Sequence, residues 1–94
     1  MRRYVIERDL PGAGSLTPGQ LQQLGQTSNA AFRELAPGIQ WEQSYVTADR
    51  IYCVYLAQDE QIIREHARRG GFPCTKISAV SSVIDSLTEF NRVM

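Results

Sequence analysis

Few side chains in this sequence can carry out acid–base or metal chemistry, and they lie far apart along the chain. His66 is the only histidine, and Glu7 is a carboxylate within a run of apolar and basic residues. Imidazole titrates near neutral pH and binds borderline metals such as nickel, zinc or copper. A carboxylate in an enclosed cavity has a raised pKa, which suits a general base or a hard metal ligand. Glu7 and His66 are therefore the candidate catalytic residues and the candidate metal ligands.

Both residues also have an ordinary structural interpretation. His66 follows Ile62 by one helical turn, where a lone histidine commonly hydrogen-bonds a loop carbonyl. Glu7 can instead be solvated at a sheet edge, or its charge can be balanced by an arginine. The neighbouring arginines in the expected sheet are Arg3, Arg8 and Arg50.

Composition and charge narrow the class of protein. A chain of 94 residues, 43% of them apolar, predicts one globular domain spanning residues 1–94. Ten acidic residues balance ten basic ones, which argues against a nucleic-acid surface. Because there is no apolar run of roughly 20 residues and no signal peptide, we expect a cytoplasmic protein without membrane contact. Cys53 and Cys74 have no CxxC spacing, so neither a zinc site nor a disulfide framework is indicated.

Hydrophobic periodicity and turn signals predict six elements. They are strands over residues 3–8, 39–46, 51–57 and 76–85 and helices over residues 18–35 and 60–69. The order βαββαβ has a standard solution, in which two crossovers give a four-stranded antiparallel sheet with both helices on one face. We therefore predict an α+β, ferredoxin-like sandwich with a core over residues 3–85. The tail, residues 86–94, is weakly patterned and is expected to pack as a strap or to fray.

The turn after the second strand decides which side chains share the open face of the sheet, the face without helices. A three-residue loop over residues 47–49 pairs Tyr45 with Ile51, whereas a two-residue loop over residues 48–49 pairs Tyr45 with Tyr52. We prefer the three-residue loop. Its open face is apolar, and pairing with a second copy is the simplest cover, so a homodimer is expected.

In the preferred register the open face carries an aromatic-walled cavity with few polar groups. Its predicted ligand-binding residues are Trp41, Gln43, Tyr45, Cys53 and Tyr55. Val5 and Glu7 of the first strand lie on the same face if the side chains of that strand alternate in the matching order. The alternative is that these aromatic side chains simply fill a dimer interface, where large flat rings bury area efficiently.

The chain resembles a family of small bacterial ferredoxin-like proteins, catalogued mainly as a domain of unknown function and including a nickel-binding, nickel-responsive member. The resemblance spans Tyr4 to Asp85 and rests on "YVIERDLPG", "WEQSYVTADRIYCVYLAQDEQIIREHARRGGFP" and "ISAVSSVID". It implies a dimeric α+β sandwich and nickel as a candidate cofactor. The family pattern commonly has a histidine before Ser-Tyr-Val, where this chain has Gln43, and glutamine is a poorer nickel ligand than imidazole.

Three functional hypotheses follow. The first is a homodimer that binds a small molecule or a divalent metal such as nickel, with Glu7 and His66 as polar ligands. The second is a cofactor-independent enzyme for proton transfer or oxygen chemistry on a small apolar substrate. In that enzyme Glu7 and His66 act as acid and base, while Tyr45 and Tyr55 orient the substrate. The third is an interaction module without a site.

Overall fold

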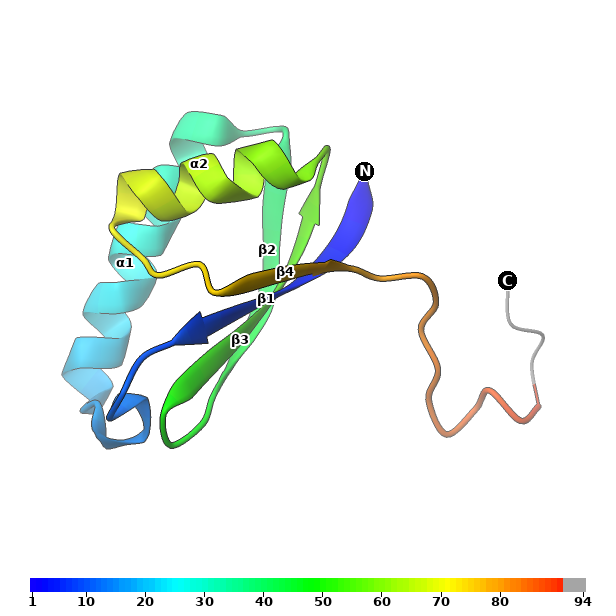
Figure 1. The fold of residues 1–94 in the computed structure, drawn as a ribbon, viewed down its shortest axis with the longest axis horizontal. Helices are drawn as coiled ribbons and strands as arrows, with labels where there is room; N and C mark the ends of the chain where they lie inside the picture. Colours follow the sequence, from blue (N-terminus) through cyan, green and yellow to red (C-terminus); the bar gives the residue numbers. More distant parts are fainter. Residues whose placement is uncertain (91–94) are drawn as a thin grey trace.

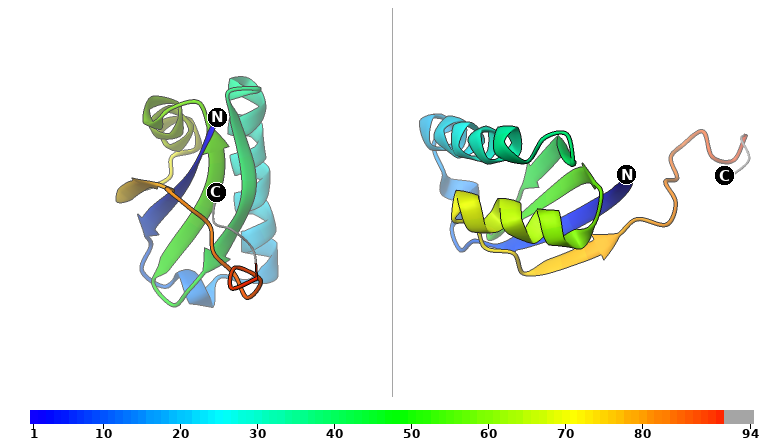
Figure 2. Two further views of the ribbon diagram at one scale, coloured as in Figure 1. Left: turned by 90° about the vertical axis from the view of Figure 1, so that its right-hand side faces the viewer. Right: turned by 90° about the horizontal axis from the view of Figure 1, so that it is seen from above.

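A computed structural model describes residues 1–90 of the chain. The elements in chain order are β1 (Arg2–Asp9), a short 3-10 helix η1 (Ala13–Ser15), α1 (Pro18–Leu35), β2 (Ile39–Val46), β3 (Arg50–Ala57), α2 (Glu60–Gly70) and β4 (Lys76–Ala79). All paired strands are antiparallel, in the order β2-β3-β1-β4. Both helices cover the same face of the sheet (Figures 1 and 2). The predicted α+β topology is confirmed.

Helix α1 begins where its sequence signals place it. The Thr17 side chain accepts a hydrogen bond from the Gln20 backbone N–H, and the Gln20 side chain accepts one from the Thr17 N–H, which completes a capping box. Pro18 occupies the first helical position, where a missing N–H costs nothing. Phe32 and Ser28 are buried on the inner stripe of the helix.

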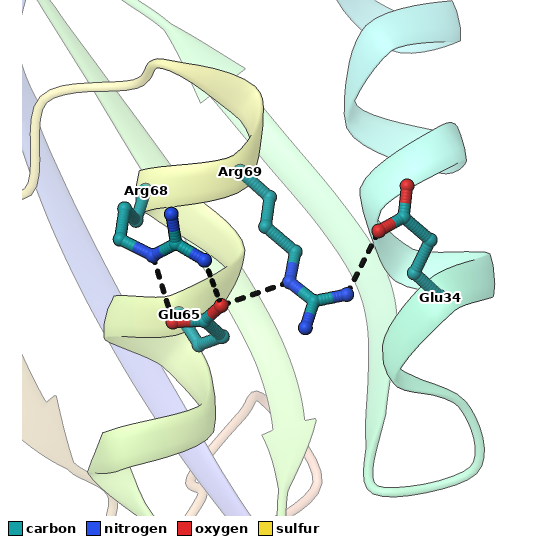
Figure 3. A network of polar contacts seen from close by, with 4 residues as sticks. All are labelled: Glu34, Glu65, Arg68 and Arg69. Carbon is teal, nitrogen blue, oxygen red and sulfur yellow. Dashed lines mark hydrogen bonds and ion pairs between the residues drawn. The ribbon is translucent and has the colours of Figure 1, made fainter.

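Helix α2 is also bounded as predicted. Asp59 accepts a hydrogen bond from the Ile62 N–H at 2.9 Å, and Gly71 ends the helix in the left-handed region with φ of 70°. On its outer face Glu65 pairs with Arg68 and Arg69, whose hydrogen bonds lower the Glu65 pKa to about 2. Arg69 also reaches Glu34 of α1 at 2.8 Å (Figure 3). Glu65, Arg68 and Arg69 therefore form a solvated face of α2, and the ion pair between Arg69 and Glu34 links this face to α1.

The turn between β2 and β3 has two residues, so the preferred three-residue loop is wrong. The Thr47 N–H donates to the Arg50 carbonyl at 2.8 Å, and Tyr45 lies opposite Tyr52. A β-bulge between Trp41 and Gln43 then shifts the register by one residue. Beyond the bulge, Trp41 lies opposite Tyr55, as in the preferred register.

Strand β4 is shorter than predicted and ends at Ala79 rather than at residue 85. The reason is its partner: β4 pairs antiparallel with β1, and the Val80 N–H donates to the Arg3 carbonyl, one residue from Arg2, where β1 begins. Residues 80–90 run on beyond the sheet (Figure 1). Of the predicted tail over 86–94, residues 91–94 lie outside the described part. Among residues 1–90, neither helix is long and apolar enough to span a bilayer.

Candidate ligand-binding cavity

Glu7 lies on the open face of β1 and is paired with an arginine. Its carboxylate accepts a hydrogen bond from Arg50 at 3.0 Å, and Arg50 also contacts Asp9 at 2.6 Å. The Glu7 side chain is 23% exposed. The structural interpretation of Glu7, in which an arginine balances its charge, is therefore the one found.

His66 lies on α2, fully buried against the opposite face of the sheet. Its Nε2 atom is 3.3 Å from both the hydroxyl and the backbone carbonyl oxygen of Ser28, and its ring stacks on Phe32 with 3.9 Å between centroids. The His66 pKa is lowered to about 4, because burial and, to a smaller extent, the charge of Arg8 lower it more than the hydrogen bond with the Ser28 carbonyl raises it. The imidazole is therefore neutral at physiological pH. Its Nδ1 atom is buried without a partner among the described residues.

The bulge in β2 separates the five predicted ligand-binding residues onto two faces. Cys53 and Tyr55 are buried on the helix side, and Trp41, opposite Tyr55, lies there too and stacks on Phe32. Gln43 and Tyr45 lie on the open face, where the Gln43 amide donates to the Tyr45 hydroxyl. The predicted open-face cavity is therefore wrong, because Trp41 and Tyr55 pack under the helices and Tyr45 alone of its three aromatic rings is on the open face.

A cavity of about 110 Å³ lies instead between α1 and the helix-covered face of the sheet. We call it the α1 cavity. Helix α1 contributes Leu21, Leu24, Gly25 and Ser28, the sheet contributes Arg8, Trp41, Ser44, Val46, Ile51, Cys53 and Tyr55, and Leu10, Phe72 and Pro73 come from loops. Three of the five predicted ligand-binding residues thus line a cavity, on the other side of the sheet. Their contact with a ligand stays a prediction.

The α1 cavity is open to solvent beside two apolar residues. Leu21 of α1 is 37% exposed and Val46 at the end of β2 is 42% exposed, although both line the cavity. Strand β2 is an edge strand of the sheet, so the space beneath α1 is not closed there by a further strand. A small molecule can enter between the helix and this edge.

Arg8 supplies the charge in the α1 cavity. It is only 4% exposed, and it donates to the Pro73 carbonyl at 2.6 Å and to the Tyr55 hydroxyl at 2.9 Å. Its guanidinium carbon lies 5.5 Å from the centre of the Phe72 ring. Burial lowers the Arg8 pKa, but Tyr55 and Cys53 raise it by more, so the side chain stays charged.

Comparison with known proteins places the chain in a family. Residues 4–80 match the model of the family described as "Nickel responsive protein SCO4226-like". The chain belongs to this SCO4226-like family. The crystal structure of SCO4226 from Streptomyces coelicolor A3(2) has the same fold, with a TM-score of 0.73, 20% identity, and coverage of 87% of this chain and 99% of that chain. No match was found among curated proteins. The predicted family and the ferredoxin-like fold are confirmed.

Among residues 1–90, the candidate donors do not converge on one site for the nickel that the family name suggests. Glu7 and His66 lie on opposite faces of the sheet, so they cannot share a metal ion or exchange a proton within one chain. Residues 1–90 contain no group of three or more His, Cys, Asp and Glu side chains that could hold a metal. The individual roles of Glu7 and His66 stay predictions.

Sequence reasoning missed Arg8 and Gly25 as cavity residues. The sequence signal for Arg8 is the alternation of side chains along β1. Residues two apart in a strand point to the same face, so Arg8 lies on the same face as the buried Tyr4 and Ile6. The signal for Gly25 is its place in the middle of an 18-residue helix, where glycine costs about 1 kcal/mol relative to alanine.

Proposed function

We propose that this member of the SCO4226-like family is a small-molecule-binding protein whose ligand occupies the α1 cavity. The observation that carries the proposal is the cavity itself, which is mostly apolar, open at one edge and supplied with a few polar groups. Ligand sites typically combine an apolar lining with a few polar groups that fix orientation. An engineered apolar cavity of about 150 Å³ holds benzene. At about 110 Å³, this cavity suits a molecule of similar or smaller size, or one that extends through the mouth.

Gly25 leaves room at the cavity wall for an occupant. A Cβ atom at Gly25 would meet no other atom within 4 Å, so a single substitution could fill part of this space. The chain has instead a helix-weakening glycine at the cavity wall.

Titration with a neutral apolar probe tests this proposal. We expect benzyl alcohol to shift the amide NMR signals of Leu24, Gly25 and Cys53 in a saturable manner. Gly25→Leu should abolish the shifts, because its side chain occupies the cavity. Gly19→Leu is the matched control, since Gly19 lies on the same helix, is exposed and does not line the cavity. Absence of saturable shifts in the wild type, or equal shifts in Gly25→Leu, would contradict the proposal.

Nickel binding is a second candidate, favoured by the family match. Because Glu7 and His66 cannot meet within one chain, a nickel site needs donors from a second copy. Glu7 on the open face is the better placed of the two, since His66 is fully buried under α2. His66 has its Nε2 atom beside Ser28 and a low pKa.

Isothermal titration with nickel chloride tests the second candidate. We expect the heat of binding to fall in Glu7→Gln and to be unchanged in His66→Gln. No heat with the wild-type protein would rule out nickel, and loss of binding in His66→Gln alone would overturn the assignment of Glu7. Benzyl alcohol binding measured on the same samples reports the α1 cavity independently.

A further inference from the structure

Arg8 is a buried cation without an anionic partner in the part of the chain that the structure describes. Arg8 donates to the Pro73 carbonyl and the Tyr55 hydroxyl, which are neutral groups, and it also contacts the Cys53 side chain. The carboxylates that form ion pairs do so with Arg3, Arg50, Arg64, Arg68 and Arg69. None of these ion pairs includes Arg8.

A buried charge is normally balanced by a counter-charge, because removal from water is costly unless the charge is paired. Tyr55 cannot supply that charge, since burial raises its pKa more than Arg8 lowers it and the hydroxyl stays protonated. The rings of Tyr55 and Phe72 lie 5.9 and 5.5 Å from the guanidinium carbon and satisfy it only in part. Arg8 lines the α1 cavity, so an anion inside the cavity can reach it.

We propose that the ligand of the α1 cavity is a small monocarboxylate with an apolar body, and that Arg8 binds its carboxylate. The proposal rests on the proposed function, because it names the chemical class that the same cavity accepts. A guanidinium has five N–H donors in a planar fork that matches the two oxygens of a carboxylate. Two of those donors are directed to Pro73 and Tyr55, and the Cys53 side chain is a third partner, which still leaves others for a ligand.

Tyr55 and the apolar walls complete the recognition of such a ligand. The Tyr55 hydroxyl accepts from Arg8 and retains its own proton, which it can donate to a carboxylate oxygen. The remaining wall consists mainly of apolar side chains such as Leu21, Leu24 and Trp41. A fully polar anion such as inorganic phosphate would leave oxygens unpaired against these residues. A short aliphatic or small aromatic body fills the same space favourably.

Three unbranched probes of five carbon atoms each separate charge from shape. Amide NMR titration with pentanoate, pentanol and pentylammonium gives a dissociation constant for each probe. A hydrogen bond to a charged group strengthens binding by about ten- to a hundredfold. We therefore expect pentanoate to bind to the wild-type protein about ten- to a hundredfold more tightly than pentanol, and pentylammonium to bind more weakly than both.

Variants of Arg8 test whether this preference depends on the guanidinium. Arg8→Met retains about the length of the apolar stem of arginine without the guanidinium, and replacing a buried charge by an apolar group is often tolerated. We expect Arg8→Met to lose the preference for pentanoate over pentanol. Arg64→Met, which removes an exposed arginine of α2, is the matched control and should keep the preference. Tyr55→Phe changes a single hydroxyl and should reduce the preference severalfold, so the test holds even if Arg8→Met does not fold.

The outcomes separate this inference from the proposed function. If pentanol and pentanoate bind to the wild type equally well, the cavity binds small molecules but the carboxylate assignment is wrong. If Arg8→Met folds and keeps the full preference for pentanoate, Arg8 is not the carboxylate-binding residue. If no probe binds to the wild type, the proposed function fails and this inference fails with it.

Discussion

His66 is the buried base of this fold, and its pKa couples the stability of the domain to pH. In the unfolded chain its pKa is 6.5, whereas burial and the nearby charge of Arg8 lower it to about 4 in the folded protein. Between these values the unfolded chain binds one more proton than the folded chain. The contribution of the neutral imidazole is therefore fully present above pH 6.5 and is lost as the pH falls toward 4.

We predict that the free energy of unfolding falls by about 2 kcal/mol between pH 7.5 and pH 5 through His66 alone. His66→Phe keeps a ring against Phe32 but has no titratable group, so this part of the pH dependence should disappear. Urea unfolding followed by the fluorescence of Trp41, the only tryptophan, measures both proteins at each pH. Identical pH profiles for the two proteins would mean that His66 is not buried and neutral as described.

At the scale of single elements, α1 forms one wall of the cavity and depends on its N-terminal cap. Thr17→Ala removes the side chain that accepts from the Gln20 N–H, which should lower the free energy of unfolding by about 1 kcal/mol. Thr27→Ala is the control, because Thr27 is exposed on the same helix and alanine has the higher helix propensity. Urea unfolding should rank the proteins as Thr27→Ala, wild type and Thr17→Ala, from most to least stable. A Thr17→Ala variant as stable as the wild type would show that the capping box contributes nothing.

Elements with local signals could be predicted from the sequence, and those set by pairing between distant segments could not. Thr17 and Gly71 act within one turn of the helix ends that they define, so both helices are correctly placed. The bulge after Trp41 depends on contacts between β2 and β3, and Glu42, the extra residue in that stretch, pairs with Arg3 of β1. No residue type near Trp41 indicates a bulge. The bulge explains why Gln43 and Tyr45 are separated from Trp41, whereas the α1 cavity was missed because Trp41, Cys53 and Tyr55 were assigned to the open face.

At the scale of the whole molecule, two apolar surfaces are not packed against another helix or strand among residues 1–90. The open face of the sheet carries Val5, Tyr45, Tyr52, Val54 and Leu56. Beyond β4, Val83, Ile84 and Phe90 are each more than half exposed. Exposed apolar patches of this kind commonly mark interfaces. The homodimer therefore stays a prediction, now with the open face and residues 80–90 as its contact surfaces.

Sedimentation equilibrium tests the homodimer. We expect the wild-type protein to sediment as a dimer and Val54→Arg to sediment as a monomer. Val54 lies on β3, an interior strand, so an arginine there would be an unpaired charge at the centre of the predicted interface. Such a charge typically costs 3–5 kcal/mol, which raises the dissociation constant of the dimer by at least about a hundredfold. Thr27→Arg on the outer surface of α1 adds the same charge away from the open face and should leave the dimer intact. A monomeric wild-type protein, or a dimer that tolerates Val54→Arg, would remove the open face as the interface and with it any nickel site shared through Glu7.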